Sequence, residues 1–318
     1  MGLPVSVYRS TDAGAPVGTA ARPLDWITIL KKCLVEGYGD KAPLGWTLEF
    51  ENVSTYAAVF KNNPVIGSGG YFQIASSNGG NGLNVAIDLS VAKGMTGVGV
   101  YVDKILQRRL GLYNDRSNGW IVLGTSRGFW MLQNSVENTW SSSTGQSSAC
   151  WSVFVGDIET FDPNDNSPFT LVHGVAGTGD STSAGYSDNI GSSSNGAVAV
   201  MLPALSGSGR YEHRVESNMI GFTGSDQNPG GIFSTNLPMV FTPAILRRGA
   251  TNSPQGNITV SDNLPYIRGV IPALVVPSIQ GGRSLTGFDH TFDSVMYRVV
   301  QGYSTTMYWL KMEGEWYA

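Results

Sequence analysis

Residues 120–132 of the chain read Trp-Ile-Val-Leu-Gly-Thr-Ser-Arg-Gly-Phe-Trp-Met-Leu, two short apolar runs on either side of a glycine-bounded segment. The runs, Trp120–Leu123 and Phe129–Leu132, have the length of buried β-strands rather than of helices. Gly124 and Gly128 bound the residues between them, and glycine suits positions where the chain turns tightly. We therefore expect a hairpin of two strands here.

The same residues also satisfy Gly-x-Ser-x-Gly, the nucleophile elbow of α/β hydrolases, with Ser126 at the serine position. An elbow places its serine on a turn between a strand and a helix, whereas residues 129–132 predict a strand. A catalytic triad would also need an acid and a histidine further along the chain, and His173, His213 and His290 are the candidates. The simpler interpretation, a glycine-flanked hairpin turn, is favoured over a hydrolase nucleophile.

Strand patterns continue on both sides of this hairpin. Upstream, Trp46, Leu48 and Phe50 alternate with polar residues, which is the period of a half-buried strand. Asp103–Leu112 is ambiguous, since its apolar spacing permits a short helix that Gly111 would soon end. The other expected strands are Tyr56–Phe60, Tyr71–Ile74, Asn84–Leu89, Trp151–Gly156 with Phe169–Val172 as its partner, Val198–Leu202, Met239–Leu246, Ile267–Ile271, Val295–Val300 and Met307–Met312.

One helix is expected, over residues 23–37. Pro23 suits a first helical turn, and the apolar residues Ile27, Leu30 and Leu34 recur at helical spacing. The glycine at position 37 is placed to end the helix in a left-handed cap.

Many short strands between turn residues, with one early helix, predict a mainly β protein. We expect a sandwich or barrel-like domain of short antiparallel strands with one early α-helix. Residues 1–140 form an N-terminal β-rich region that contains the helix, and residues 141–318 a C-terminal β-rich region with long polar loops, unless the two make one continuous domain. The side chains expected in the core are Trp46, Phe50, Trp120, Phe129 and Trp151.

The composition excludes several classes of protein. The chain has 41 glycines in 318 residues and only 14% charged residues, against about 25% in an average domain. A coiled coil would need segments rich in charge and poor in glycine, and collagen would need glycine at every third residue. A disordered chain would need low hydrophobicity and high net charge, whereas this chain is 41% hydrophobic with a net charge of -4. Twenty basic against twenty-four acidic residues leave no electrostatic footprint for nucleic acid or an anionic membrane. Low charge instead suits a subunit that is packed against other subunits.

Candidate metal and thiol sites are weak. Asp162–Asn166 resembles the start of a calcium loop, but Ser167 stands at the glycine position and His173 at the position of the bidentate glutamate. A β-turn asks for the same residues, so we expect a turn. The three histidines have no metal-ligand spacing, and Cys33 and Cys150 are too few for a cysteine site, so we expect buried thiols. We therefore expect no catalytic residue, cofactor or metal ion.

The sequence predicts neither export nor a membrane span. The first 30 residues lack the basic start and apolar stretch of a secretory signal. No run of about 18 apolar residues is present.

Four stretches occur in an order that spans nearly the whole chain: Ile29–Gly39 with Gly45–Phe50, Trp120–Leu123 through Phe129–Leu132, Phe154–Ile158 continuing to Phe161, and Arg268–Leu274 with the late Gly314–Trp316. Taken together they resemble a family of virion structural proteins of tailed bacteriophages that has no defined role. Residues 177–196 and 205–236 depart from that family's pattern and resemble insertions. No catalytic residue is carried over from the family.

The resemblance implies a non-enzymatic structural component that is made in the host cytoplasm and assembled into the virion. Among virion positions, we expect the tail, collar or baseplate region rather than a capsid decoration. The partners would be copies of the chain itself, in a closed ring or trimer, and other virion proteins. One alternative is a receptor-binding module whose surface tryptophans and tyrosines stack on host polysaccharide. The other is a hydrolase that uses Ser126.

Overall fold

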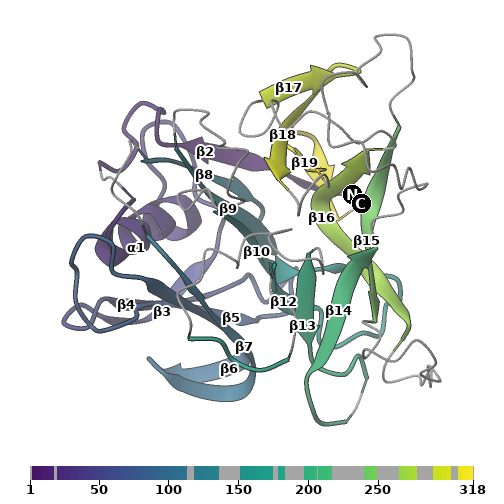
Figure 1. Ribbon diagram of the computed structural model, residues 1–318, viewed down its shortest axis with the longest axis horizontal. Helices are drawn as coiled ribbons and strands as arrows, with labels where there is room; N and C mark the ends of the chain where they lie inside the picture. Colours follow the sequence, from purple (N-terminus) through teal and green to yellow (C-terminus); the bar gives the residue numbers. More distant parts are fainter. Residues whose placement is uncertain are drawn as a thin grey trace, which may run out of the picture.

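β-Strands dominate the computed structural model of the chain, with one α-helix near its start, as the sequence predicts (Figure 1). The structure describes residues 2–17, 20–112, 118–135, 151–174, 178–182, 197–205, 207–216, 240–248, 265–277, 289–301 and 307–317. The predicted loop at 141–148, Cys150, and most of 177–196 and 205–236 lie outside these residues. No helix within the described part of the chain is long and apolar enough to cross a membrane.

Two antiparallel sheets account for most of the described strands. One has five strands in sequence order: β3 (Thr47–Asn52), β4 (Ala57–Lys61), β5 (Tyr71–Ser76), β6 (Ile87–Gly97) and β7 (Val100–Leu110). The other has thirteen, in the order β17 (Asp289–Phe292), β18 (Val295–Gln301), β19 (Met307–Lys311), β16 (Ile267–Pro277), β15 (Phe241–Arg248), β14 (Tyr211–Glu216), β13 (Val198–Met201), β12 (Phe169–His173), β10 (Trp151–Asp157), β9 (Gly128–Ser135), β8 (Asn118–Gly124) and β2 (Ser6–Arg9), with β11 (Glu159–Thr160) paired to β16. Near the two ends of the chain, β1 (Leu3–Pro4) pairs with β20 (Glu315–Trp316).

The expected hairpin at residues 120–132 is present as β8 and β9, and both of its faces are buried. Trp120, Val122, Phe129 and Met131 belong to one hydrophobic core. The alternating residues Ile121, Leu123, Trp130 and Leu132 belong to a second core on the other face of the sheet. A strand that is covered on both faces needs no polar alternation, which explains the unbroken apolar runs of the sequence.

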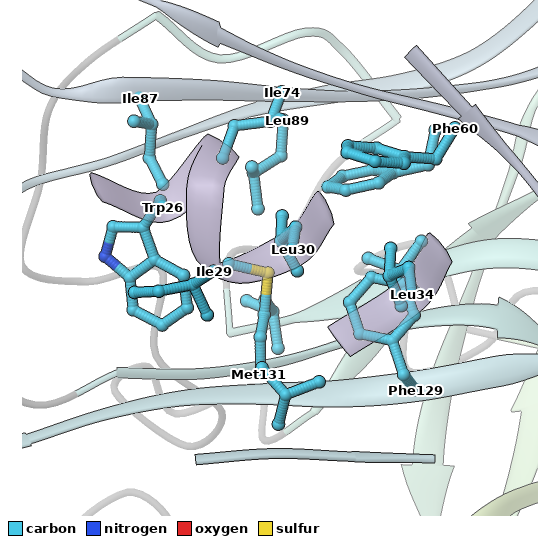
Figure 2. Close-up of a cluster of buried hydrophobic side chains, with 14 of the residues drawn as sticks. Trp26, Ile29, Leu30, Leu34, Phe60, Ile74, Ile87, Leu89, Phe129 and Met131 are labelled. Carbon is cyan, nitrogen blue, oxygen red and sulfur yellow. The ribbon is translucent and has the colours of Figure 1, made fainter. Parts of the chain in front are cut away.

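The first core lies between the five-stranded sheet and the hairpin, and the helix fills it. Helix α1 spans Pro23–Lys31 and continues in a π-helical turn over Lys32–Glu36, so the predicted length is right although the last turn is wider than expected. Gly37 has the expected positive φ of 78°, but its ψ of 172° is extended rather than left-handed helical. Figure 2 shows Trp26, Ile29, Leu30 and Leu34 of the helix between Phe60, Ile74, Ile87 and Leu89 on one side and Phe129 and Met131 on the other.

The second core lies inside the curl of the longer sheet. Strand β11 begins two residues after β10 ends and pairs with β16, five strands away along the sheet. At the edges of the same sheet, Arg9 of β2 forms an ion pair with Asp289 of β17 at 2.7 Å. The longer sheet is therefore barrel-like, and the five-stranded sheet and the helix cover its outer face at β8–β10 in the manner of a sandwich.

The ambiguous segment 103–112 is almost entirely strand, because it pairs with β6 as part of β7. The distal parts of β6 and β7 form an arm that packs on the outer face of the five-stranded sheet. There Met95 and Tyr101 pack near Phe50, which is half-buried under this arm rather than part of the main core as expected. The other four predicted core residues are buried in the first core.

The late strands also differ from the prediction in length. β16 runs to Pro277, six residues beyond the expected end, and contains Pro272 within its span. Ala273, next to that proline, has a φ of 66°, and the pairing of β15 with β16 is irregular over this stretch. All seven tryptophans in the described residues are buried, which confirms their predicted role in core packing: Trp26, Trp46, Trp120, Trp130, Trp151, Trp309 and Trp316.

Candidate functional site

Ser126 lies in the turn between β8 and β9, as the hairpin interpretation predicts. The residues after it form strand β9 rather than a helix, so the strand–turn–helix geometry of a nucleophile elbow is not formed here. Its backbone oxygen accepts a hydrogen bond from the Asn63 amide at 3.0 Å. The turn therefore contacts the loop between β4 and β5.

The three candidate histidines lie in three separate environments. Buried His173, in β12, accepts a hydrogen bond at Nδ1 from Arg108 Nε at 3.3 Å, and burial, with the Arg108 charge, holds its pKa well below the usual value. Buried His213, in β14, has its Nδ1 3.3 Å from its neighbour's carbonyl oxygen, and burial lowers its pKa to about 3, helped by the Arg268 charge. His290, in β17, packs against the ring of Trp309, in β19.

The strand register separates His173 from the hairpin turn. Asp157 pairs with Phe169 and Gly156 pairs with Gly128, so this end of β10 and β12 lies beside the turn. His173 comes four residues after Phe169, at the opposite end of β12. The structure therefore does not bring this histidine together with Ser126.

The calcium-loop candidate at 162–166 forms a turn whose carboxylates bind protein groups. Asp162 Oδ1 accepts a hydrogen bond from the Asn164 amide at 2.9 Å. Both oxygens of buried Asp165 accept hydrogen bonds from buried Arg268, at 2.8 and 3.0 Å. Among the described residues no group of three or more His, Cys, Asp or Glu side chains could hold a metal ion.

A buried carboxylate lies beside the hairpin turn, on Asp157, the last residue of β10. Its side chain is fully buried and accepts hydrogen bonds from the Ser68 amide, at 2.9 Å, and from the Ser68 hydroxyl. Arg127 Nε lies 3.6 Å from the carboxylate. Burial raises the pKa of Asp157, and the Ser68 hydrogen bonds and the Arg127 charge offset only part of that rise.

Four segments of the chain meet around Asp157. Loop 62–70, which joins β4 to β5, is tied to the hairpin turn because Asn62 Nδ2 donates to the Arg127 carbonyl at 3.1 Å. From the end of the chain, the buried Tyr317 hydroxyl donates to the Asp157 carbonyl at 2.7 Å. The Arg127 guanidinium also stacks on the Tyr317 ring at 4.0 Å. We call this arrangement of residues 62, 68, 127, 157 and 317 the junction network.

Glycines allow the segments of the junction network to approach closely. A Cβ on Gly156, whose φ is 143°, would lie 2.2 Å from the Gly128 Cα on the neighbouring strand. A Cβ on Gly70 would lie 2.2 Å from the Phe169 ring. The glycines at these two positions therefore serve backbone and ring contacts that no other residue allows.

The tip of loop 62–70 is apolar and exposed. Val65 is 88% exposed and Ile66 45%, although both are branched aliphatic residues. The tip is held by short local bonds: Asn63 Oδ1 accepts from the Val65 amide at 2.9 Å, and the Asn63 carbonyl accepts from the Gly67 amide at 2.8 Å. The junction network thus fixes a loop that displays two apolar side chains to solvent.

Sequence reasoning missed the junction network. Its only local signal was the glycine cluster at residues 67–70, which predicts a break between strands but no site. Neither a protein-family model nor a curated protein matches the chain. The case for a function therefore depends on this geometry and on the resemblance described above.

Proposed function

We propose that the chain is a non-enzymatic structural subunit of a tailed bacteriophage virion, in its tail, collar or baseplate region. It acts by assembling with copies of itself and with other virion proteins. The resemblance of its sequence to a family of such proteins supports this proposal. The observation that carries it is the fixed, apolar tip of loop 62–70.

The cost of the junction network supports an interaction role for the loop. Burying a carboxylate costs several kcal/mol unless hydrogen bonds and charges offset it, and the raised pKa of Asp157 means that the offset is incomplete. Val65 and Ile66 belong to neither core, and both are exposed on the loop. Protein interfaces gain affinity from apolar anchors that are held in place before binding, because less freedom is lost on association.

The test is the replacement of the loop tip. We expect the Val65→Asp/Ile66→Asp double variant to lose self-association, measured by light scattering after size exclusion, and incorporation into particles. Val53→Asp is the matched control, because Val53 is 74% exposed in the turn between β3 and β4. The control should assemble as the natural protein does. A natural protein that stays monomeric and does not enter particles would end this proposal.

A further inference from the structure

Two asparagine–glycine pairs lie in loop 77–86, which joins β5 to β6. Asn78 precedes Gly79, and Asn81 precedes Gly82. An asparagine that is followed by glycine is especially prone to spontaneous deamidation, because glycine has no side chain to shield its backbone nitrogen or to restrict its conformation. The surroundings of each pair therefore decide which of the two reacts in the folded protein.

The two asparagines are held in different ways. Asn78 is exposed, and its Oδ1 accepts a hydrogen bond from the Gly80 amide of the same loop at 2.9 Å. Asn81 is half-buried, and its Oδ1 accepts from the Leu24 amide in the first turn of α1, also at 2.9 Å. Asn78 can therefore change its conformation by breaking a local bond, whereas Asn81 must first separate the loop from the helix.

The second half of the loop is also anchored and more crowded. The Asn84 amide donates to the Ala21 carbonyl, just before α1, at 3.1 Å. A Cβ on Gly82 would lie 3.2 Å from Val85 Cγ2, whereas a Cβ on Gly79 would have nothing within 4 Å in the described part of the chain. The backbone at Gly79 is therefore open to water and has room to move.

We propose that Asn78 is a site of spontaneous deamidation in the folded protein and that Asn81 is protected from it. The Gly79 backbone nitrogen attacks Cγ of Asn78, and the new N–Cγ bond closes a five-membered succinimide ring. The Cγ–Nδ2 bond breaks, and the departing nitrogen takes the proton of the Gly79 amide and leaves as ammonia. Water then adds to either carbonyl carbon of the ring, which leaves aspartate or isoaspartate at position 78.

The product differs from the natural chain in charge and in backbone. Each reaction turns a neutral amide into a carboxylate, so the formal net charge of -4 becomes more negative by one. Isoaspartate also lengthens the main chain by one carbon, at the turn that the Gly80 amide closes. Loop 77–86 is separate from loop 62–70, so this modification does not depend on the proposed assembly.

The test is peptide mapping by mass spectrometry of the natural protein, stored at mildly alkaline pH both folded and in concentrated urea. Fragment ions separate Asn78 from Asn81. In the folded protein Asn78 should convert at least about five-fold faster than Asn81, because the Asn81 reaction requires the loss of a hydrogen bond to the helix. In urea the two should convert at similar rates, since unfolding removes that bond.

The pair Asn118–Gly119 is a matched control within the same chain. Both residues lie at the start of β8 and pair with β9, which holds their backbone extended. We therefore expect this pair to convert in urea and to stay intact in the folded protein. Equal rates at Asn78 and Asn81 in the folded protein, or an Asn78 that converts only in urea, would overturn the proposal.

Discussion

Strands β8, β9 and β10 carry buried polar side chains at both ends, and the two ends differ in whether those side chains are hydrogen-bonded. At the turn end, the Asp157 carboxylate accepts two hydrogen bonds from Ser68 and lies beside Arg127. At the other end, the Gln133 amide and the indole N–H groups of Trp120 and Trp151, which lie opposite it on the neighbouring strands, have no hydrogen bond within the described chain. Both ends are buried in the same sheet.

The difference separates a buried polar group that holds segments together from one that does not. A carboxylate with partners on other segments ties those segments together, and here it fixes loop 62–70 against the hairpin turn. A buried amide whose polar atoms make no hydrogen bond costs about 1–3 kcal/mol in stability. We infer that the turn end of these strands serves architecture.

The largest expected effect is at the turn end. Asp157→Ala should lower the free energy of unfolding by about 3 kcal/mol, because it leaves the Ser68 amide and hydroxyl without their acceptor in the interior. Asp157→Asn keeps an acceptor oxygen and should cost about 1 kcal/mol. Urea denaturation measures both. If Asp157→Ala were as stable as the natural protein, the Asp157 carboxylate would not be needed to hold these segments together.

The pH dependence of the same residue sharpens this point. Burial raises the pKa of Asp157 in the folded protein, so the folded state holds that proton more tightly than the unfolded chain. Relative to Asp157→Asn, the natural protein should therefore gain stability as the pH falls through the raised pKa toward about 3.9, by up to about 1.4 kcal/mol per unit. Denaturation curves at several pH values give the difference, and a relative loss on acidification would contradict the assignment.

At the Gln133 end of these strands, a substitution should raise the free energy of unfolding and not lower it. Gln133→Leu should raise the free energy of unfolding by about 1 kcal/mol, since it removes a buried amide that makes no hydrogen bond within the described part of the chain. Gln73→Leu is the matched variant, because the Gln73 amide accepts from Gly99 and donates to Tyr101. That variant should be destabilised. If both variants shift in the same direction, the contrast between the two glutamines is lost.

The smallest effect on folding is expected at the loop tip. Val65→Asp/Ile66→Asp should change the free energy of unfolding of the monomer by less than about 0.5 kcal/mol, since both side chains are exposed. Thermal unfolding of dilute protein measures this change. A large destabilisation would mean that the tip supports the fold and is not reserved for a partner.

The sequence predicts the parts of this fold that depend on local pattern. The hairpin at 120–132 and the helix at 23–37 were predictable because their spacing and turn residues lie within a few positions of each other. Segment 103–112 was not, because its apolar residues fit a helix and a strand equally and its pairing with β6 decides the outcome.

The junction network and the arrangement around Gln133 depend on contacts that no local pattern records. Ser68 and Asp157 are 89 positions apart in the chain. Gln133 follows directly after an apolar run, so the sequence alone suggests the end of a buried segment rather than a residue between two tryptophans. Register across three strands, and not spacing along one, creates that arrangement.

The most direct test of the central claim, that the junction network holds an assembly contact, is a cryo-electron microscopy map of assembled particles with this chain traced into it. The account predicts that Val65 and Ile66 are buried against a neighbouring subunit, with loop 62–70 in the conformation described here. A map in which this loop faces solvent in every copy, or in which the particle does not contain the chain, would contradict it.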